Sequence, residues 1–364
     1  MASYGKNFKI SVFGQSHGEA IGAVCENFPV GFSPDLDELK KFMLRRASRS
    51  NLTTPRREGD VVELVSGLNS NGKTCGAPIC AIIKNENTRS SDYGEKLDIP
   101  RPSHADLSAF LKYGENYDHR GGGQFSGRLT APICAIGGLC IQYLHSIGIE
   151  IRAHISSIGA VRDLMYEAIR EYPDVTEKEL PVIGDYLIEL YKEMIASAKE
   201  DGDSLGGTVE CAVLGMPAGY GGELFDGLEG RIAAAIFGIP AVKGIEFGSG
   251  FFGSTVRGSE NADEIKVSEN GAITTETNKH GGILGGISSG NPIVFNVAFK
   301  PTPTISKELH SVSISSGENV TLQARGRHDP CVVLRAVPCV EAIAAIAILD
   351  ILMEKNIIIN EETK

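Results

Sequence analysis

The 364-residue sequence lacks several features that would place it in special classes of protein. It has no run of about eighteen or more apolar residues, so we expect no membrane-spanning segment. Its first residues, MASYGKNFKI, contain no apolar signal-peptide core, which favours a cytoplasmic protein. Its net charge of −11 argues against a nucleic-acid partner, because such binding depends on neutralising phosphates.

Paired cysteine motifs are also missing. Eight cysteines occur, but none has CxxC spacing or the Cys/His spacing of a zinc site, so we expect no bound metal. Stretches such as APICAIGGLC place them among apolar residues, which is typical of buried free thiols. A disulfide framework would need an oxidising compartment, for which the sequence has no sign.

What is present indicates a globular protein with a full core. Hydrophobic residues make up 42% of the chain and charged residues 22%. Apolar patterns of strand and helix period alternate, and no low-complexity linker divides them, so we predict one α+β domain over residues 1–364, with helices layered on sheets. The expected strands are 7–13, 61–67, 77–85, 149–159, 206–215, 241–248 and 290–301, and the expected helices are 33–48, 104–114, 130–147, 176–200, 226–238 and 338–354.

A basic segment stands out in this acidic chain. Residues 39–57 contain seven bases and no acid. Lys40 and Lys41 suit the negative pole of a helix end, whereas the arginines that follow favour a small anionic ligand.

Two histidines lie at the ends of predicted elements. His17, in FGQSHG, follows a strand, and it is either a surface-loop residue or a group that moves protons. His104 stands at a helix start beside Asp106, where it either caps the helix or acts as a neutral base.

Three further loops combine glycine with polar residues. GGGQFSGRLTA, from residue 121, matches neither the Rossmann nor the Walker pattern, but Ser126 and Arg128 suit an anion cradle at a helix start. The loop 280–291, HGGILGGISSGN, could lie against a flat or phosphorylated ligand. Arg327 and Asp329, in RGRHDP, form either a salt-bridged turn or a proton relay. Together the five loops favour a phosphorylated substrate, a phosphate-bearing cofactor and proton transfer.

These motifs resemble those of the chorismate synthase family. FGQSHG, RPSHAD, GGGQFSGRLTA, GGILGGISSG, KPTPTI and GRHDPCVVLRAVP occur in that family's order across nearly the whole chain. The resemblance implies a β-α-β sandwich fold and a homotetramer. It also implies that 5-enolpyruvylshikimate 3-phosphate is converted to chorismate by 1,4-anti elimination of phosphate and a proton, with bound reduced FMN (FMNH2).

The resemblance also assigns residues. His17, His104 and Asp329 match the family's proton-transfer residues. The matches to flavin contacts are Gln124, Phe125, Ser126, Gly285, Lys300, Pro301, Thr302, Pro303, Thr304 and Arg327. The matches to the substrate or NADP site are Arg45, Arg49, Asn51, Ser126 and Arg128.

The sequence departs from the family pattern at several of these positions. Asn51 stands where an arginine is common, and we expect Arg49 to supply the missing charge. Gln124 and Phe125 replace an Arg-Ser pair, and Ser103 replaces a glycine.

Two alternatives stay open at this point. A flavin oxidoreductase would need a nicotinamide site, and the sequence has no Rossmann fingerprint. A non-catalytic protein that binds FMN or a phosphorylated metabolite would keep the arginines but would not need His17, His104 and Asp329 together. Because no added reductase domain is visible, we expect an external flavin reductase or another source of reduced FMN as partner.

Overall fold

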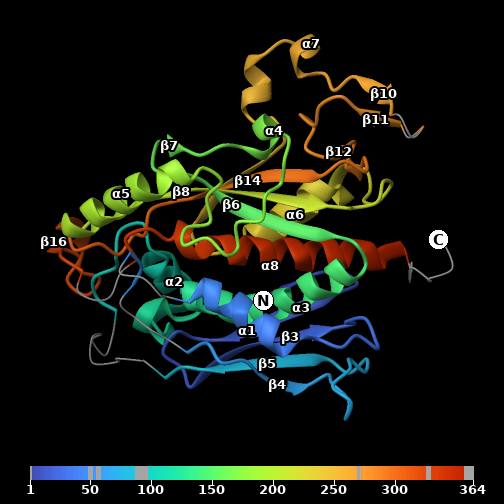
Figure 1. Ribbon diagram of the computed structural model, residues 1–364. Helices are drawn as coiled ribbons and strands as arrows, with labels where there is room; N and C mark the ends of the chain where they lie inside the picture. Colours follow the sequence, from blue (N-terminus) through green and yellow to red (C-terminus); the bar gives the residue numbers. More distant parts are fainter. Residues whose placement is uncertain are drawn as a thin grey trace.

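Two antiparallel β-sheets enclose a layer of helices in the computed structural model (Figure 1). The structure describes residues 2–47, 52–54, 59–86, 97–268, 271, 273–324 and 329–355. The predicted α+β class and the β-α-β sandwich are confirmed. The predicted layering of helices on sheets takes the form of a helical layer between the two sheets.

The first sheet is built from the amino-terminal part of the chain. Its strands lie in the order β1 (Ser3–Tyr4), β2 (Lys9–Gly14), β3 (Ala20–Glu26), β5 (Ile79–Lys84) and β4 (Glu63–Ser66). In β5, Ile79, Ala81 and Ile83 are buried and alternate with more exposed residues. This period-two pattern gives the sheet one apolar face, which packs on the helices.

The second sheet is built from later segments. Its strands lie in the order β7 (Val161–Arg162), β6 (Glu150–Ile158), β8 (Gly207–Leu214), β14 (Ile293–Phe299) and β9 (Val242–Phe247). Each of the two sheets therefore contains five antiparallel strands among the described residues.

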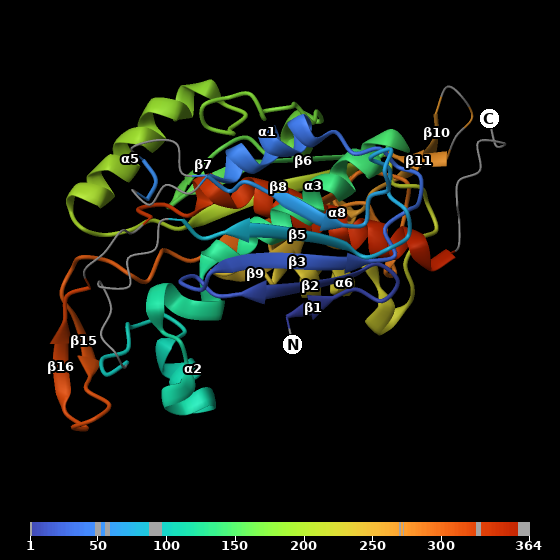
Figure 2. The ribbon, with the colours of Figure 1, turned by 90° about the horizontal axis from the view of Figure 1, so that it is seen from below.

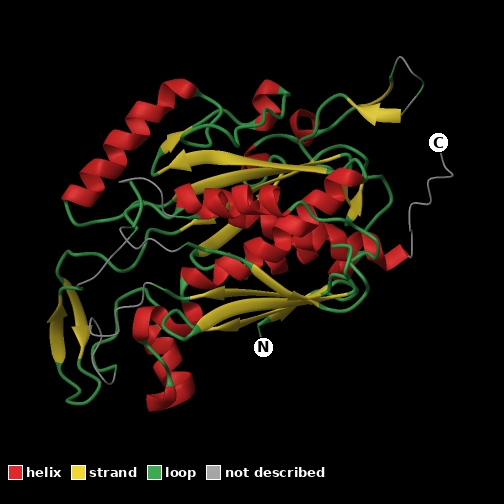
Figure 3. Cartoon of the chain, turned by 60° about the horizontal axis from the view of Figure 1, so that its bottom comes forward, coloured by secondary structure: helices red, strands yellow, loops and turns green. Residues whose placement is uncertain are grey.

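The helical layer consists of α1 (Leu36–Arg46), α3 (Thr130–Ser146), α6 (Leu228–Ile236) and α8 (Val333–Leu352), seen between the sheets in Figure 3. Every residue of α8 except Arg335 is buried. A helix that is buried on every side needs partners all round. Those of α8 are α1, α3, α6 and strands β6 and β8 of the second sheet. One continuous cluster of buried apolar side chains runs through both sheets and this layer.

Smaller elements surround the sandwich. They are α2 (Asp106–Tyr113), α4 (Tyr166–Ile169), α5 (Ile188–Glu200), α7 (Gly258–Asn261), β10 (Ile265–Val267), β11 (Ile273–Thr275), β12 (Ile283–Leu284), β13 (Ile287–Ser288), β15 (Leu309–Val312) and β16 (Asn319–Leu322). Figure 2 shows α2 and the β15–β16 hairpin projecting together from one end of the sandwich.

Three predicted helix starts differ from the structure by three residues or more. The first helix begins at Leu36 rather than at residue 33, because Asp35 caps it by accepting from two backbone N–H groups. The predicted helix 176–200 begins only at Ile188, after Pro181 and Gly184. The last helix begins at Val333 and continues through Pro338, since burial on all sides outweighs the loss of one N–H donor.

One segment has the length and hydropathy of a membrane span. It covers Arg120–Ser146, and 67% of its apolar window is buried inside the protein. Most of it is α3, which lies in the helical layer between the sheets as a core helix.

Candidate active site

A cavity of about 910 Å³ lies between loops that come from both halves of the sandwich. The first half supplies His17 and the segments around His104 and Ser126. The second half supplies residues 237–241, 299–300 and 302–304. Asp329, just before α8, and Arg335, in its first turn, complete the wall. Residues far apart in the sequence therefore meet at one end of the helical layer.

The glycine run passes between the two histidines. Gly121, Gly122 and Gly123 all have positive φ angles, from 53° to 83°. A Cβ atom on Gly121 would lie 2.5 Å from the ring of His17, and one on Gly122 would lie 3.1 Å from Nε2 of His104. Glycine is needed here because the backbone conformation is left-handed and because side chains would displace both imidazoles.

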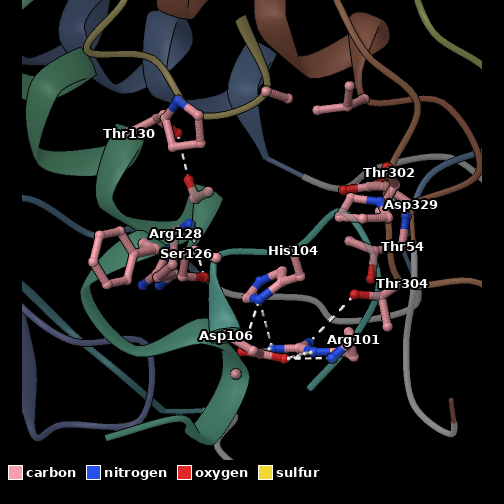
Figure 4. A pocket seen from close by; sticks show the side chains of 18 of the residues that line it. Thr54, Arg101, His104, Asp106, Ser126, Arg128, Thr130, Thr302, Thr304 and Asp329 are labelled. Carbon is pink, nitrogen blue, oxygen red and sulfur yellow. Dashed lines mark hydrogen bonds and ion pairs between the residues drawn. The ribbon is translucent and has the colours of Figure 1, made fainter. Parts of the chain in front are cut away.

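His104 is oriented by a carboxylate and an arginine (Figure 4). Its Nδ1 lies 2.8 Å from Asp106 Oδ1 and 3.2 Å from Arg101 Nη2. Arg101 also donates to both oxygens of Asp106 and, at 3.3 Å, to Thr304. Asp106 is 1% exposed, and its hydrogen bonds from His104 and Arg101 outweigh burial and lower its pKa. A carboxylate on Nδ1 favours the tautomer with the proton there, which leaves Nε2 for the cavity.

A second buried carboxylate joins two arginines in the wall of the cavity. Asp60 forms ion pairs with Arg46 through one oxygen and with Arg128 through the other. All three side chains are at most 5% exposed. Burial alone would raise the pKa of Asp60, but the two guanidinium groups outweigh it and lower that pKa. Two cations share one anion, so this group retains a positive charge beside the cavity.

Asp329 is held by both of its oxygens. Oδ1 accepts from the backbone N–H of Thr54 at 2.7 Å, and Oδ2 accepts from Arg335 at 2.7 Å. Arg335 also donates to the backbone carbonyl of Arg46 at 2.9 Å. The carboxylate is therefore fixed at the point where α1 and α8 approach the cavity.

The remaining walls are mixed in character. Phe237–Ala241 and Phe299 form an apolar side, and Phe125 adds an aromatic ring that is 38% exposed. Lys300 donates to the backbone carbonyl of Ser103, and burial together with Lys243 lowers the pKa of its ammonium group.

The cavity brings together most of the residues that the sequence predicted. Those that line it are His17, His104, Gln124, Phe125, Ser126, Arg128, Lys300, Thr302, Pro303, Thr304 and Asp329. Arg49, Asn51 and Arg327 lie outside the described residues.

Three described residues of the predicted set do not line the cavity. Arg45 donates twice to Glu341 of α8, at 2.7 and 2.8 Å. Pro301 is not among the lining residues either, although its neighbours are. Gly285 lies in the turn between β12 and β13, and the carbonyl of the next residue, Gly286, accepts from Leu228 of α6. The backbone of this loop packs directly against the backbone at Gly222. A Cβ on Gly286 would lie 2.3 Å from the Gly222 carbonyl, so the loop needs glycine there.

Sequence reasoning did not assign roles to Arg46, Asp60, Arg101 or Arg335, and it named Asp106 only as a neighbour of His104. A signal was present for Arg46. Buried Leu39 and Met43 define the inner face of α1, and Arg46 follows them at i+7 and i+3, so it points inward. Asp60 pairs with residues 14 and 68 positions away, whereas Arg101 and Arg335 pair with carboxylates only five and six positions away.

Residues with strained backbone gather at this site. Asp60, Ser103 and Ala241 have positive φ angles of 46°, 59° and 72°, although none is glycine. Asp60 and Ala241 line the cavity, and Ser103 precedes His104. Such strain is typical of functional sites, where the surrounding structure fixes the backbone.

Comparison with known proteins identifies the family. The chorismate synthase family model matches residues 8–353. The chain is 42% identical over 365 residues to the chorismate synthase of Lancefieldella parvula, covering 96% of each chain. It is 44% identical over 353 residues to that of Korarchaeum cryptofilum, covering 96% of this chain and 97% of the relative.

A solved structure supports the same assignment. "Crystal Structure of Chorismate Synthase" superposes with a TM-score of 0.75 and 29% identity, covering 96% of this chain and 93% of that one. The chain therefore belongs to the chorismate synthase family, lyases of the shikimate pathway of aromatic biosynthesis.

Proposed function

We propose that this protein converts 5-enolpyruvylshikimate 3-phosphate to chorismate by 1,4-anti elimination of phosphate and a proton, with reduced FMN bound in the same cavity. The observation that carries this proposal is the joint placement of two histidines, a fixed carboxylate and a group of arginines around one cavity. Elimination of phosphate needs cations at the leaving group and a route for the proton at carbon, and this set supplies both.

The buried arginines account for recognition of the substrate's anions. Arg46 and Arg128 carry two positive charges against the one carboxylate of Asp60. Both guanidinium groups line the cavity, and their geometry and charge suit a phosphate or carboxylate. Ser126 lies at the start of the adjacent helical turn, where its hydroxyl caps the Arg128 N–H.

His104 is suited to exchange a proton at Nε2. Asp106 holds Nδ1, so the ring cannot rotate without losing that hydrogen bond. His17 lies on the other side of Gly121 and Gly122, so the two imidazoles flank the glycine run. We assign His17 to protonation of the leaving phosphate or of the cofactor, and His104 to protonation of the reduced cofactor.

The cavity also suits a flavin. Its volume of about 910 Å³ lies near the upper end of the range for small-molecule sites, so it has room for a cofactor beside the substrate. The apolar side at Phe237–Ala241 suits a flat ring, and Lys300, Thr302 and Thr304 offer polar groups for its edges. Bound reduced FMN would supply an electron-rich ring that can donate an electron or accept a proton.

We assign Asp329 to assist removal of the proton from the substrate's carbon, because its carboxylate is fixed in position. The Thr54 N–H and Arg335 occupy one oxygen each, and each oxygen retains a second lone pair for the cavity side. This arrangement orients the carboxylate to assist proton removal.

The test is an anaerobic assay with purified protein, chemically reduced FMN and 5-enolpyruvylshikimate 3-phosphate, with chorismate followed by absorbance. We expect chorismate only when reduced flavin is present. Tight binding of both ligands without chorismate would instead favour a non-catalytic protein that binds FMN and a phosphorylated metabolite.

Two accompanying expectations are tested with the same preparation. We expect turnover to depend on an external reductant, so NADPH alone should not support it. We also expect a homotetramer in solution, which a mass measurement on the native protein checks.

A further inference from the structure

Two cysteines meet where α3 and α8 cross. The Sγ atoms of Cys134 and Cys339 are 3.8 Å apart. The helices approach closely here, because a Cβ on Gly137 of α3 would lie only 2.4 Å from Cβ of Ala342 of α8. Neither thiol has a role in the proposed reaction.

Cys339 lies on the cavity side of this pair. It lines the cavity and is 4% exposed, whereas Cys134 lies behind it and is 0% exposed. The hydrogen bond from Cys134, together with Arg46, Thr130 and Arg335, lowers the pKa of Cys339 to about 7. Burial raises the pKa of Cys134 well above its usual value. The pair thus consists of Cys339 at the cavity, whose thiol also donates to the Arg335 carbonyl at 3.3 Å, and Cys134 behind it, whose thiol donates to Cys339.

We propose that Cys134 and Cys339 form a peroxide-reactive dithiol in the wall of the active-site cavity, with Cys339 as the attacking thiol and Cys134 as the resolving thiol. The proposal rests on the contact between the two sulfurs and on the position of Cys339 at the cavity. It does not depend on which reaction the cavity catalyses.

The chemistry balances with hydrogen peroxide as the oxidant. The Cys339 thiolate attacks one peroxide oxygen, the O–O bond breaks, and a sulfenic acid and hydroxide form. The Cys134 thiol then attacks the Cys339 sulfur, forming the disulfide and releasing water. In sum, two thiols and one peroxide give one disulfide and two waters. A rotation of the side chains must close the 3.8 Å gap, since both sulfurs sit on packed helices.

The other cysteines provide internal controls. Cys140, Cys211 and Cys331 are buried, and burial raises the pKa of each thiol. Cys75 is exposed, so it reports the reactivity of an ordinary surface thiol.

The experiment treats the folded full-length protein with a small excess of hydrogen peroxide. Remaining thiols are then alkylated in denaturant, and the protein is digested without reductant for mass spectrometry. We expect a cross-linked peptide pair containing Cys134 and Cys339, lighter by two hydrogen atoms and absent after dithiothreitol. The thiols of this pair should disappear about tenfold faster than those of Cys140 and Cys211.

Single variants separate the two roles. In Cys134→Ser, Cys339 should stop at the sulfenic acid, which dimedone traps, whereas in Cys339→Ser, Cys134 should stay alkylatable. Cys140→Ser, on the same helix, is the matched control and should leave the cross-link unchanged. The proposal is overturned if both thiols of wild-type protein persist as long as Cys140 and Cys211, or if Cys339 oxidises to the sulfinic acid without joining Cys134. The oxidation of the wild-type protein tests the proposal even if a variant fails to fold.

Discussion

At the scale of single residues, the site combines strained backbone with paired charges. Patterns in the sequence singled out His17, His104 and Asp329 as candidates, because each lies beside the end of a predicted element, and the family resemblance supplied their predicted roles. They could not show that Asp60 joins Arg46 and Arg128, since that group depends on segments that meet only in the folded chain. Local patterns therefore gave candidate residues, and the tertiary fold decides which other residues surround them.

Replacement of Ser103 by glycine should stabilise the protein. Ser103 has a φ of 59°, a conformation that glycine adopts without strain, so we expect Ser103→Gly to raise the free energy of unfolding by about 0.5–1 kcal/mol. Urea unfolding measures the change. Ser197→Gly, at an exposed position inside α5, is the control and should instead lower stability by about 0.5 kcal/mol. A loss of stability in both variants would contradict the strain argument.

Asp106 should act through His104 as a positioning residue. We expect Asp106→Asn and His104→Ala each to lower kcat by roughly 10²–10⁴-fold while KM and FMN binding change little. Because Asp106 works through the imidazole, the double variant should be no slower than His104→Ala alone. Single-variant effects that multiply in the double variant would show two independent roles. Steady-state kinetics and flavin titration supply the data.

His17→Ala should follow the same pattern as His104→Ala. Loss of flavin binding in both histidine variants would assign them a structural role around the glycine run instead.

At the scale of elements, helix packing was only partly predictable. The apolar segment 130–147 was long enough to be recognised as α3, whereas α8 begins five residues before its predicted start. Pro338 obscured that start, since proline normally ends or kinks a helix. Burial of nearly every α8 side chain overrides this local preference.

The crossing of α3 and α8 should tolerate no added methyl group. We expect Gly137→Ala to lower the free energy of unfolding by about 1–3 kcal/mol, because its Cβ would clash with Ala342. Gly230→Ala in α6 is the control: a Cβ there has no neighbour closer than 4.0 Å, so about 0.5–1 kcal/mol of stabilisation is expected. If denaturant unfolding gave the same change in free energy for both variants, close packing of α3 against α8 would not explain the loss in Gly137→Ala.

A buried histidine in β6 should make stability depend on pH. His154 lies 2.8 Å from Glu210 of β8 and 3.7 Å from Asp163. Burial alone would lower its pKa, but the two carboxylates outweigh burial and raise that pKa above 6.5. The group therefore stabilises the folded state in full below pH 6.5 and progressively less as the pH rises through its folded-state pKa.

His154→Gln tests this at two levels. It should cost about 3–5 kcal/mol at low pH, because it leaves buried carboxylates without their cation. The loss of stability of the wild-type protein above pH 6.5 should also be smaller in the variant. Parallel pH profiles from urea unfolding would show that other groups dominate.

At the scale of the whole molecule, the cavity depends on both halves of the sandwich. Loops from the first sheet carry the histidines, and loops from the second carry Lys300–Thr304 and the apolar wall. The alternation of strand and helix predicted the fold class, but it could not show that the helices lie between two sheets. That arrangement is decided by which faces are buried, and α8 is buried on every side.

Ligand binding should therefore stabilise the whole chain. At a substrate concentration of 100 times Kd, we expect the free energy of unfolding to rise by about 2.7 kcal/mol. Thermal unfolding with and without 5-enolpyruvylshikimate 3-phosphate measures this gain. Arg128→Lys, which keeps the charge but loses the forked donor, should show a much smaller shift at the same concentration. An unchanged shift would exclude Arg128 from substrate binding.

The position of α8 in the chain has a consequence for biosynthesis. All the strands of both sheets precede α8, so a ribosome completes them before it makes the helix that fills the space between them. At about 5–20 residues per second, the part of the second sheet that packs on α8 stays uncovered for several seconds or longer. The nascent protein should therefore need protection from aggregation until its last helix has emerged, and its core can close only after that.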